Sequence, residues 1–137
     1  MKSSLGYLIR RTLLRRPQAV IDVTVLLWEK LAAEIVSLIG DAGFQSIYFR
    51  SGVLAASHYP WMILNSSLKQ AELQFAGLRN SLEGRNLAEI SEASVVLLTT
   101  FLEILASLIG EFLMIKLLQT AWGDDVLTPV DKNKVSW

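Results

Sequence analysis

Residues 93–110 read ASVVLLTTFLEILASLIG, and this apolar stretch decides the fold class. Its hydrophobic residues recur at steps of three and four, a spacing typical of an α-helix. The stretch is close to the roughly 18-residue minimum for a membrane-spanning helix. Glu103 lies in its middle, however, and a charge is unfavourable at the centre of a bilayer. We therefore expect a buried or interfacial helix here rather than a membrane span.

The last four letters of this stretch, SLIG, also occur at 37–40, and an acidic residue follows each copy, Asp41 or Glu111. One interpretation is chance in a chain rich in Leu, Ile and Ser. The other is an internal pseudo-repeat of a helix–Gly–helix unit. Glycine within a helix costs about 1 kcal/mol relative to alanine, so a retained glycine has a structural reason. On the second interpretation, Gly40 and Gly110 mark a bend or a close approach between helices.

The helical pattern extends beyond this stretch on both sides. Asn86 with Glu89 three residues later has the form of a capping box, and apolar periodicity then continues to Trp122. The sequence predicts one long C-terminal helix over 87–122, bent or divided at Gly110. Residues 123–137 form a polar tail.

Upstream, four more helices are predicted, each bounded by a glycine, a proline or a capping residue. The first is a basic amphipathic helix within 1–16, and the others cover 20–39, 44–59 and 67–83. No segment has the alternating pattern of a strand. The expected fold is an all-α bundle of five or six helices in a single domain, 1–137.

The composition is unusually apolar for one domain. Hydrophobic residues make up 52% of the chain and charged residues only 19%, against about 25% charged in typical soluble domains. Few charges are therefore left to cover the outside, and we expect apolar surface to be buried in a homo-oligomer or against a helical protein partner. The absence of cysteine fits a cytoplasmic protein and excludes thiolate chemistry.

Charge is balanced overall but unevenly distributed. Residues 1–16 carry five basic side chains and no acidic one, so the remainder of the chain has a net charge of −5. A basic face spread over the fold is missing, and no nucleic-acid partner is expected. Two interpretations of the first helix remain open: it lies on an anionic membrane, or it packs its leucines on the body and exposes its arginines. The contact residues in the first case are Arg10, Arg11, Arg15 and Arg16.

Few residues indicate chemistry. His58 is the one histidine, which excludes metal sites built from several His or Cys ligands, and no catalytic motif is present. His58 is interpreted as a helix-end residue bonded to a carbonyl, as a haem or pocket ligand, or as a phosphate acceptor. Arg50 is interpreted as solvent-exposed, or paired with an acid, or pointing into a cavity. If a ligand pocket exists, the candidate residues are Tyr48, Arg50, His58 and Trp61, and the cofactor is unknown.

These observations favour a non-enzymatic bacterial regulatory or adaptor protein that acts through helix-mediated self-association or partner binding. One alternative is a ligand sensor with an apolar pocket inside a helical bundle. The other is a peripheral membrane protein anchored by its basic N-terminal helix, cytoplasmic and membrane-associated.

Overall fold

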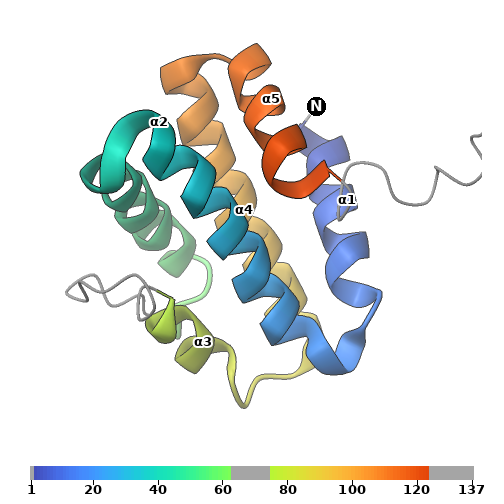
Figure 1. Cartoon of the computed structure of the whole chain (residues 1–137). Helices are drawn as coiled ribbons and strands as arrows, with labels where there is room; N and C mark the ends of the chain where they lie inside the picture. Colours follow the sequence, from blue (N-terminus) through green and yellow to red (C-terminus); the bar gives the residue numbers. More distant parts are fainter. Residues whose placement is uncertain (1, 63–74, 124–137) are drawn as a thin grey trace, which may run out of the picture.

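The computed structural model describes residues 2–62 and 75–123, and in these ranges the chain is helical and contains no strand (Figure 1). The all-α prediction is thereby confirmed. In chain order the elements are α1 (Lys2–Leu14), the short 3-10 helix η1 (Pro17–Ala19), α2 (Val20–Ala56), α3 (Ala76–Leu82), α4 (Leu87–Ile109) and α5 (Glu111–Trp122). The start of the helix predicted over 67–83 and the tail from 124 onward lie outside the described residues.

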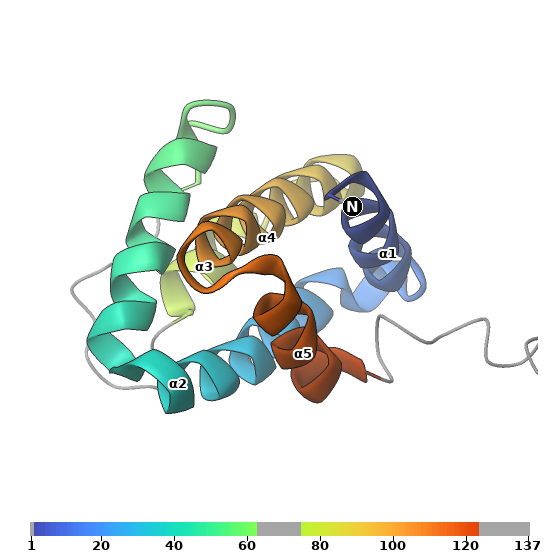
Figure 2. The same cartoon turned by 90° about the horizontal axis from the view of Figure 1, so that it is seen from above.

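The helices form a bundle in which α4 packs against α1, α2 and α5. In Figure 1, α4 and the first part of α2 rise towards the same end of the molecule, while α5 and the second part of α2 return from it. Figure 2, viewed onto that end, shows the bend of α2 and the α4–α5 turn facing the viewer. Segments far apart in the sequence therefore meet at one end of the bundle.

The two glycines of the repeated SLIG phrase adopt the same unusual backbone. Gly40 has φ 88° and ψ 165°, and Gly110 has φ 93° and ψ 150°. This region is essentially restricted to glycine, because a Cβ would clash with the main chain. Gly40 bends α2, which joins the two helices predicted over 20–39 and 44–59. Gly110 separates α4 from α5, so the single long helix expected over 87–122 is two helices.

Other helix boundaries follow the sequence signals. The Asn86 side chain accepts a hydrogen bond from the Glu89 amide at 2.8 Å and caps α4, as predicted. Gly84, with φ 86°, follows the end of α3. By contrast α2 ends at Ala56, several residues before Pro60. There the Ser57 hydroxyl bonds to the Leu54 carbonyl at 2.7 Å.

The core is built around an aromatic cluster between α2 and α4. Trp28 lies at its centre, with ring centroids 5.0 Å from Tyr48 and 5.1 Å from Phe101. Phe44 and Phe75 complete the cluster. Ring pairs at such separations favour one packing arrangement, because edge and face carry opposite partial charges.

Hydroxyl groups buried near this core bond to the preceding helical turn. Thr24 donates to the Val20 carbonyl and Ser51 to the Ile47 carbonyl, each at 2.8 Å. A buried hydroxyl without a partner would be unfavourable, and these bonds remove that cost. Thr24 and Ser51 are thus compatible with a dry core, whereas the buried Ser94 hydroxyl has no partner among the described residues.

Candidate functional site

The four residues proposed from the sequence as ligand contacts do not converge. Tyr48 is buried in the aromatic cluster, whereas Arg50 is exposed. His58 is exposed beyond the end of α2, and its backbone amide bonds to the Ala55 carbonyl at 2.9 Å. Trp61 is partly buried elsewhere. None of the four lines either of the two cavities described below, and the pocket predicted around them stays a prediction.

Tyr48 has a packing role in this arrangement. Its hydroxyl is buried and has no hydrogen-bond partner among the described residues, and the same holds for Nε1 of Trp28. Burial raises the pKa of Tyr48, because the phenolate is poorly solvated in an apolar interior. The side chain therefore stays neutral, without the charge needed to recognise an ionic ligand.

Trp61 has a partner that the sequence did not indicate. The guanidinium of Arg85 lies 4.3 Å from the centre of the Trp61 ring. Cation–π contact of this kind stabilises a local structure by roughly 0.5–1 kcal/mol at exposed sites. Arg85 is 24 residues away in the sequence, beyond the helix predicted over 67–83, so no local pattern could have revealed the pair.

The N-terminal helix packs its apolar residues on the body, one of its two predicted arrangements. Leu5, Ile9 and Leu13 are buried, and α1 contacts α4. Of its arginines, Arg10 forms an ion pair with Glu92 at 3.0 Å. Arg11 is half-buried, and Arg15 and Arg16, which follow the end of α1, are exposed.

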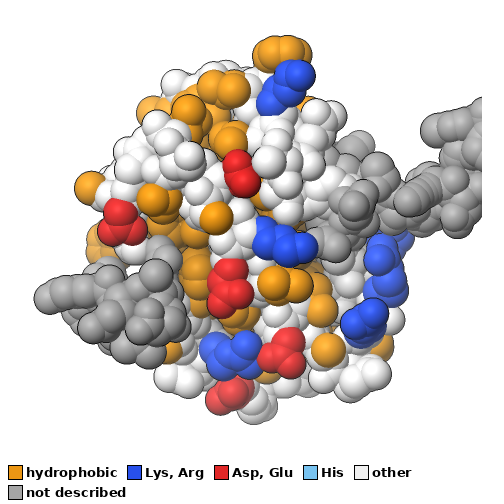
Figure 3. All heavy atoms as spheres, in the orientation of Figure 1, with side chains coloured by type: hydrophobic (Ala, Val, Ile, Leu, Met, Phe, Trp, Pro, Cys, Tyr) orange, Lys and Arg blue, Asp and Glu red, His pale blue; other side chains and the backbone are white. Residues whose placement is uncertain are grey.

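Five large apolar side chains are exposed at the end of the bundle where both SLIG phrases lie. We call this surface the glycine end, and its members are Leu38, Ile39, Leu108, Phe112 and Leu113. Phe112 is 77% exposed and Leu108 is 65% exposed. Figure 3 shows hydrophobic side chains gathered at this end, uppermost in the view. Soluble monomers rarely leave contiguous apolar surface uncovered without a binding role.

Gly40 and Gly110 do not have the close-approach role expected of them. A Cβ added at either position would meet no atom of the described residues, beyond its immediate chain neighbours, within 4 Å. The requirement for glycine comes instead from the positive φ of both residues. Leu38 and Ile39 before Gly40 are exposed, as is Leu108 before Gly110, whereas Ile109 is half-buried against the core.

Charged side chains of both signs border the glycine end. Asp41 and Glu111 begin the helical segments that follow the two glycines, where a carboxylate interacts favourably with the helix dipole. Lys116 Nζ lies 5.5 Å from the centre of the Phe112 ring. Within the described residues, no ion pair to any of these three groups is observed.

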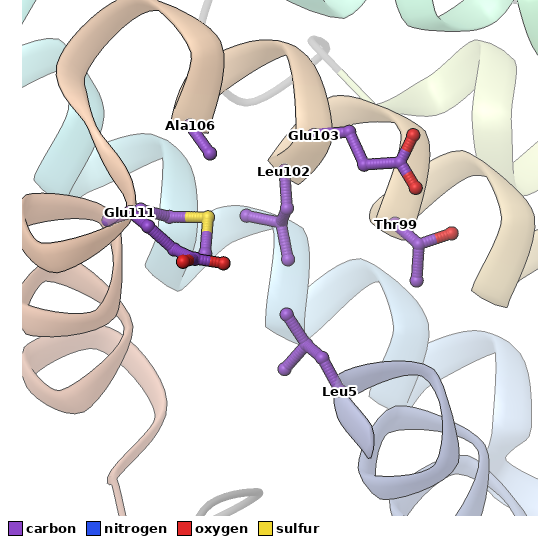
Figure 4. Close-up of a pocket in the computed structure, with 7 residues that line it drawn as sticks. Leu5, Thr99, Leu102, Glu103, Ala106 and Glu111 are labelled. Carbon is purple, nitrogen blue, oxygen red and sulfur yellow. The ribbon is translucent and has the colours of Figure 1, made fainter. Parts of the chain in front are cut away.

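A cavity of about 400 Å³ lies between α1, α4 and α5, beside the α4–α5 turn (Figure 4). Its walls are mainly apolar: Leu5 enters from α1, Leu102 and Ala106 from α4, and Met114 from α5. Thr99, Glu103 and Glu111 provide the polar part of the lining. No sequence pattern indicated this cavity, because its apolar residues occupy ordinary core positions of three different helices.

The α4 helix is long and apolar enough to cross a membrane by length and composition, and 44% of its most apolar window is buried inside the molecule. It contacts three other helices, as a core helix of a bundle does. Among the described residues, no group of three or more His, Cys, Asp or Glu side chains is placed to hold a metal ion.

Comparison with models of protein families, with curated proteins and with solved structures finds no match to this chain.

Proposed function

We propose that this protein is a non-enzymatic regulatory or adaptor protein that self-associates through the glycine end. The observation that supports it is the exposure of five large apolar side chains on one end of the bundle. Burying them removes apolar surface from water, which is the main favourable contribution to association. The absence of a recognisable catalytic motif in the sequence agrees with a binding role.

A second copy of the chain is the partner that fits this surface best. In a two-fold symmetric dimer the same patch meets itself, so each charge must find its opposite within the patch. The glycine end meets this condition, because Lys116 of one copy can pair with Glu111 or Asp41 of the other. Such pairs would set the orientation of the two copies, while the leucines and Phe112 supply most of the affinity.

Sedimentation equilibrium over a range of protein concentrations tests the proposal. We expect a concentration-dependent dimer for the natural chain. Leu108→Glu combined with Phe112→Glu should weaken dimerisation by at least about a hundredfold, since two large apolar contacts are lost in each copy. Both side chains are mostly exposed in the monomer, so the variant should retain its helical circular dichroism.

Val53→Glu is the matched control. Val53 is 56% exposed but lies on the second part of α2, outside the glycine end. This variant should dimerise like the natural chain. A natural chain that sediments as a monomer at all concentrations would refute the proposal, and so would equal weakening by the control.

We further propose that residues 20–56 and 87–122 form an internal pseudo-repeat. The support is local: both units consist of a helix, a glycine of positive φ and a second helix that begins with an acid. Such a repeat would place two similar apolar turns on one interface.

A second candidate function, a ligand sensor, is favoured by the cavity beside Met114. Its volume of about 400 Å³ is within the range of small-molecule sites. Native mass spectrometry of protein purified from several expression hosts would detect a retained ligand. If the ligand is lost from a Met114→Trp variant and retained by a Trp61→Phe variant, it binds in this cavity. Retention by the Met114→Trp variant would exclude the cavity as its site.

A further inference from the structure

One stripe of α1 combines basic and apolar side chains and faces away from the body. Tyr7, Arg11 and Leu14 follow one another at steps of four and three, which places them on the same side of α1, and Arg15 follows the last residue of the helix. Tyr7, Leu14 and Arg15 are exposed, and the apolar residues of the opposite stripe are buried. The α1 helix is therefore packed on the body through one stripe, and its other stripe is accessible to a binding partner.

The basic groups of this stripe form no ion pair with an acidic side chain of the described residues. Arg11 lies with its guanidinium 5.5 Å from the centre of the Tyr7 ring. Arg15 and Arg16 are exposed and form no ion pair within the described ranges 2–62 and 75–123. Unneutralised arginines next to one another create a positive local potential, although the chain as a whole has no net charge.

A shallow hollow of about 170 Å³ lies where the end of α1 meets α2. It is lined by Thr12, Arg15 and Arg16 and by Val23, Leu26 and Leu27 of α2. Leu26 is 45% exposed, and Leu14, the last residue of α1, is 38% exposed. The hollow is smaller than a typical site for a whole drug-sized ligand. Its dimensions and lining suit a short length of hydrocarbon beneath an anionic head group.

In Figure 3, basic side chains with hydrophobic ones beside them are visible along the side formed by α1, at the right of the view. We propose that this face, consisting of Tyr7, Arg11, Leu14, Arg15, Arg16 and Leu26, binds the surface of an anionic phospholipid membrane. The leucines enter the boundary between head groups and acyl chains, and the arginines contact lipid phosphates. A face that alternates arginines with exposed leucines matches this layered environment.

The same observations argue against a nucleic acid as the partner. Exposed leucines gain little from a phosphate backbone, and the chain beyond residue 16 has a net charge of −5, which would repel an extended polyanion. A membrane surface needs only one basic face, because the rest of the protein points into solution.

Vesicle co-sedimentation with the full chain tests this inference. We expect binding to vesicles of phosphatidylcholine mixed with phosphatidylglycerol, and little binding to phosphatidylcholine alone. Replacing Arg15 and Arg16 by glutamine should reduce the partition coefficient by about 25-fold, since each arginine near an anionic surface contributes about a fivefold factor. Leu14→Asn with Leu26→Asn should reduce it by about tenfold or more through lost apolar insertion.

The control variant combines Arg50→Gln with Arg79→Gln and changes net charge by the same amount at positions outside both this face and the glycine end. Its vesicle binding should stay within about twofold of the natural chain. No binding to anionic vesicles would overturn the inference, as would equal losses in the arginine pair and its control. Binding to single-stranded RNA as strong as to vesicles, and unaffected by the leucine changes, would overturn it in favour of a general polyanion site. Neither result depends on dimerisation, which is measured separately.

Discussion

The indole Nε1 of Trp122 donates a hydrogen bond to the main-chain carbonyl of Leu27 at 3.0 Å, although the two residues are 95 positions apart. Both side chains are buried. The bond ties the last residue of α5 to the first part of α2, and it holds the returning helix against the bundle after the turn at Gly110. The position of the glycine end therefore depends partly on a contact at the other end of α5.

Trp122→Phe should lower the free energy of unfolding by about 2–3 kcal/mol, because it removes this hydrogen bond and leaves a cavity. Trp28→Phe is the comparison, since Trp28 is equally buried but its Nε1 has no partner among the described residues. The Trp28→Phe change should lower the free energy of unfolding by at least about 1 kcal/mol less than Trp122→Phe does. Urea unfolding followed by circular dichroism measures both, and a larger loss at Trp28 would contradict the role given to the Trp122 bond.

Gly40→Ala and Gly110→Ala should each destabilise the fold by about 1–3 kcal/mol, because alanine is strained at the backbone angles of both positions. Open space around each site means that the loss comes from the backbone alone. Thermal unfolding of the single variants gives the values, and similar losses at the two sites are expected.

Gly6→Ala is the control for this pair. Gly6 lies within α1, and an added Cβ would contact Thr99 and Val95 side chains at ordinary distances of 3.7 and 3.8 Å. Alanine should therefore stabilise the protein by about 0.5–1 kcal/mol. Stabilisation at Gly40 or Gly110 of the same size would show that the positive φ is not required there.

Stability should fall at alkaline pH because of Tyr48. Its folded-state pKa is raised above the ordinary value of 10.0 by burial, so the folded state keeps a proton that the unfolded state loses. Its contribution is fully present below pH 10.0 and declines above it, by up to about 1.4 kcal/mol for each further pH unit. Urea unfolding between neutral pH and pH 11 measures this slope.

Tyr48→Phe should remove that slope and leave stability near neutral pH unchanged or slightly higher, since the hydroxyl has no partner among the described residues. A Tyr48→Phe protein with undiminished alkaline sensitivity would assign the effect to other groups.

Asn86→Ala should cost about 1 kcal/mol, because it removes the side-chain acceptor of the first turn of α4. Asn86→Ser should retain most of the stability, and Asn80→Ala, at an exposed position within α3, should have little effect. Hydrogen exchange of the Glu89 amide reports directly on the cap. If the Glu89 amide exchanges as slowly in Asn86→Ala as in the natural chain, the Asn86 side chain does not cap α4.

Much of the secondary structure could be predicted because its causes are local. The Asn86 cap, the end of α3 before Gly84 and the apolar stripe of α1 depend on residues within a few positions of one another. The two SLIG phrases also marked the two bends, since an interrupted helix with a glycine is visible in the sequence. The reason for the glycines was not visible there, because close contact and a positive φ predict the same residue.

The candidate sites were harder to predict, for a different physical reason. Tyr48, Arg50, His58 and Trp61 lie close together in the sequence, yet a helix turns successive residues in different directions, and only the packing against α4 decided that Tyr48 points inward. The cavity beside Met114 is formed by three helices from opposite halves of the chain, so no local sequence pattern could predict it.

By itself the sequence determined a helical protein with too few charges to cover its surface, a basic first helix and two glycine-marked bends, because these properties depend on composition and on neighbours along the chain. Only the tertiary structure decided that both bends lie at one end of the bundle and expose Leu108 and Phe112 there. Which apolar faces meet each other is settled by long-range packing, such as that between Trp122 and Leu27, and whatever packing leaves uncovered becomes the surface available to a partner.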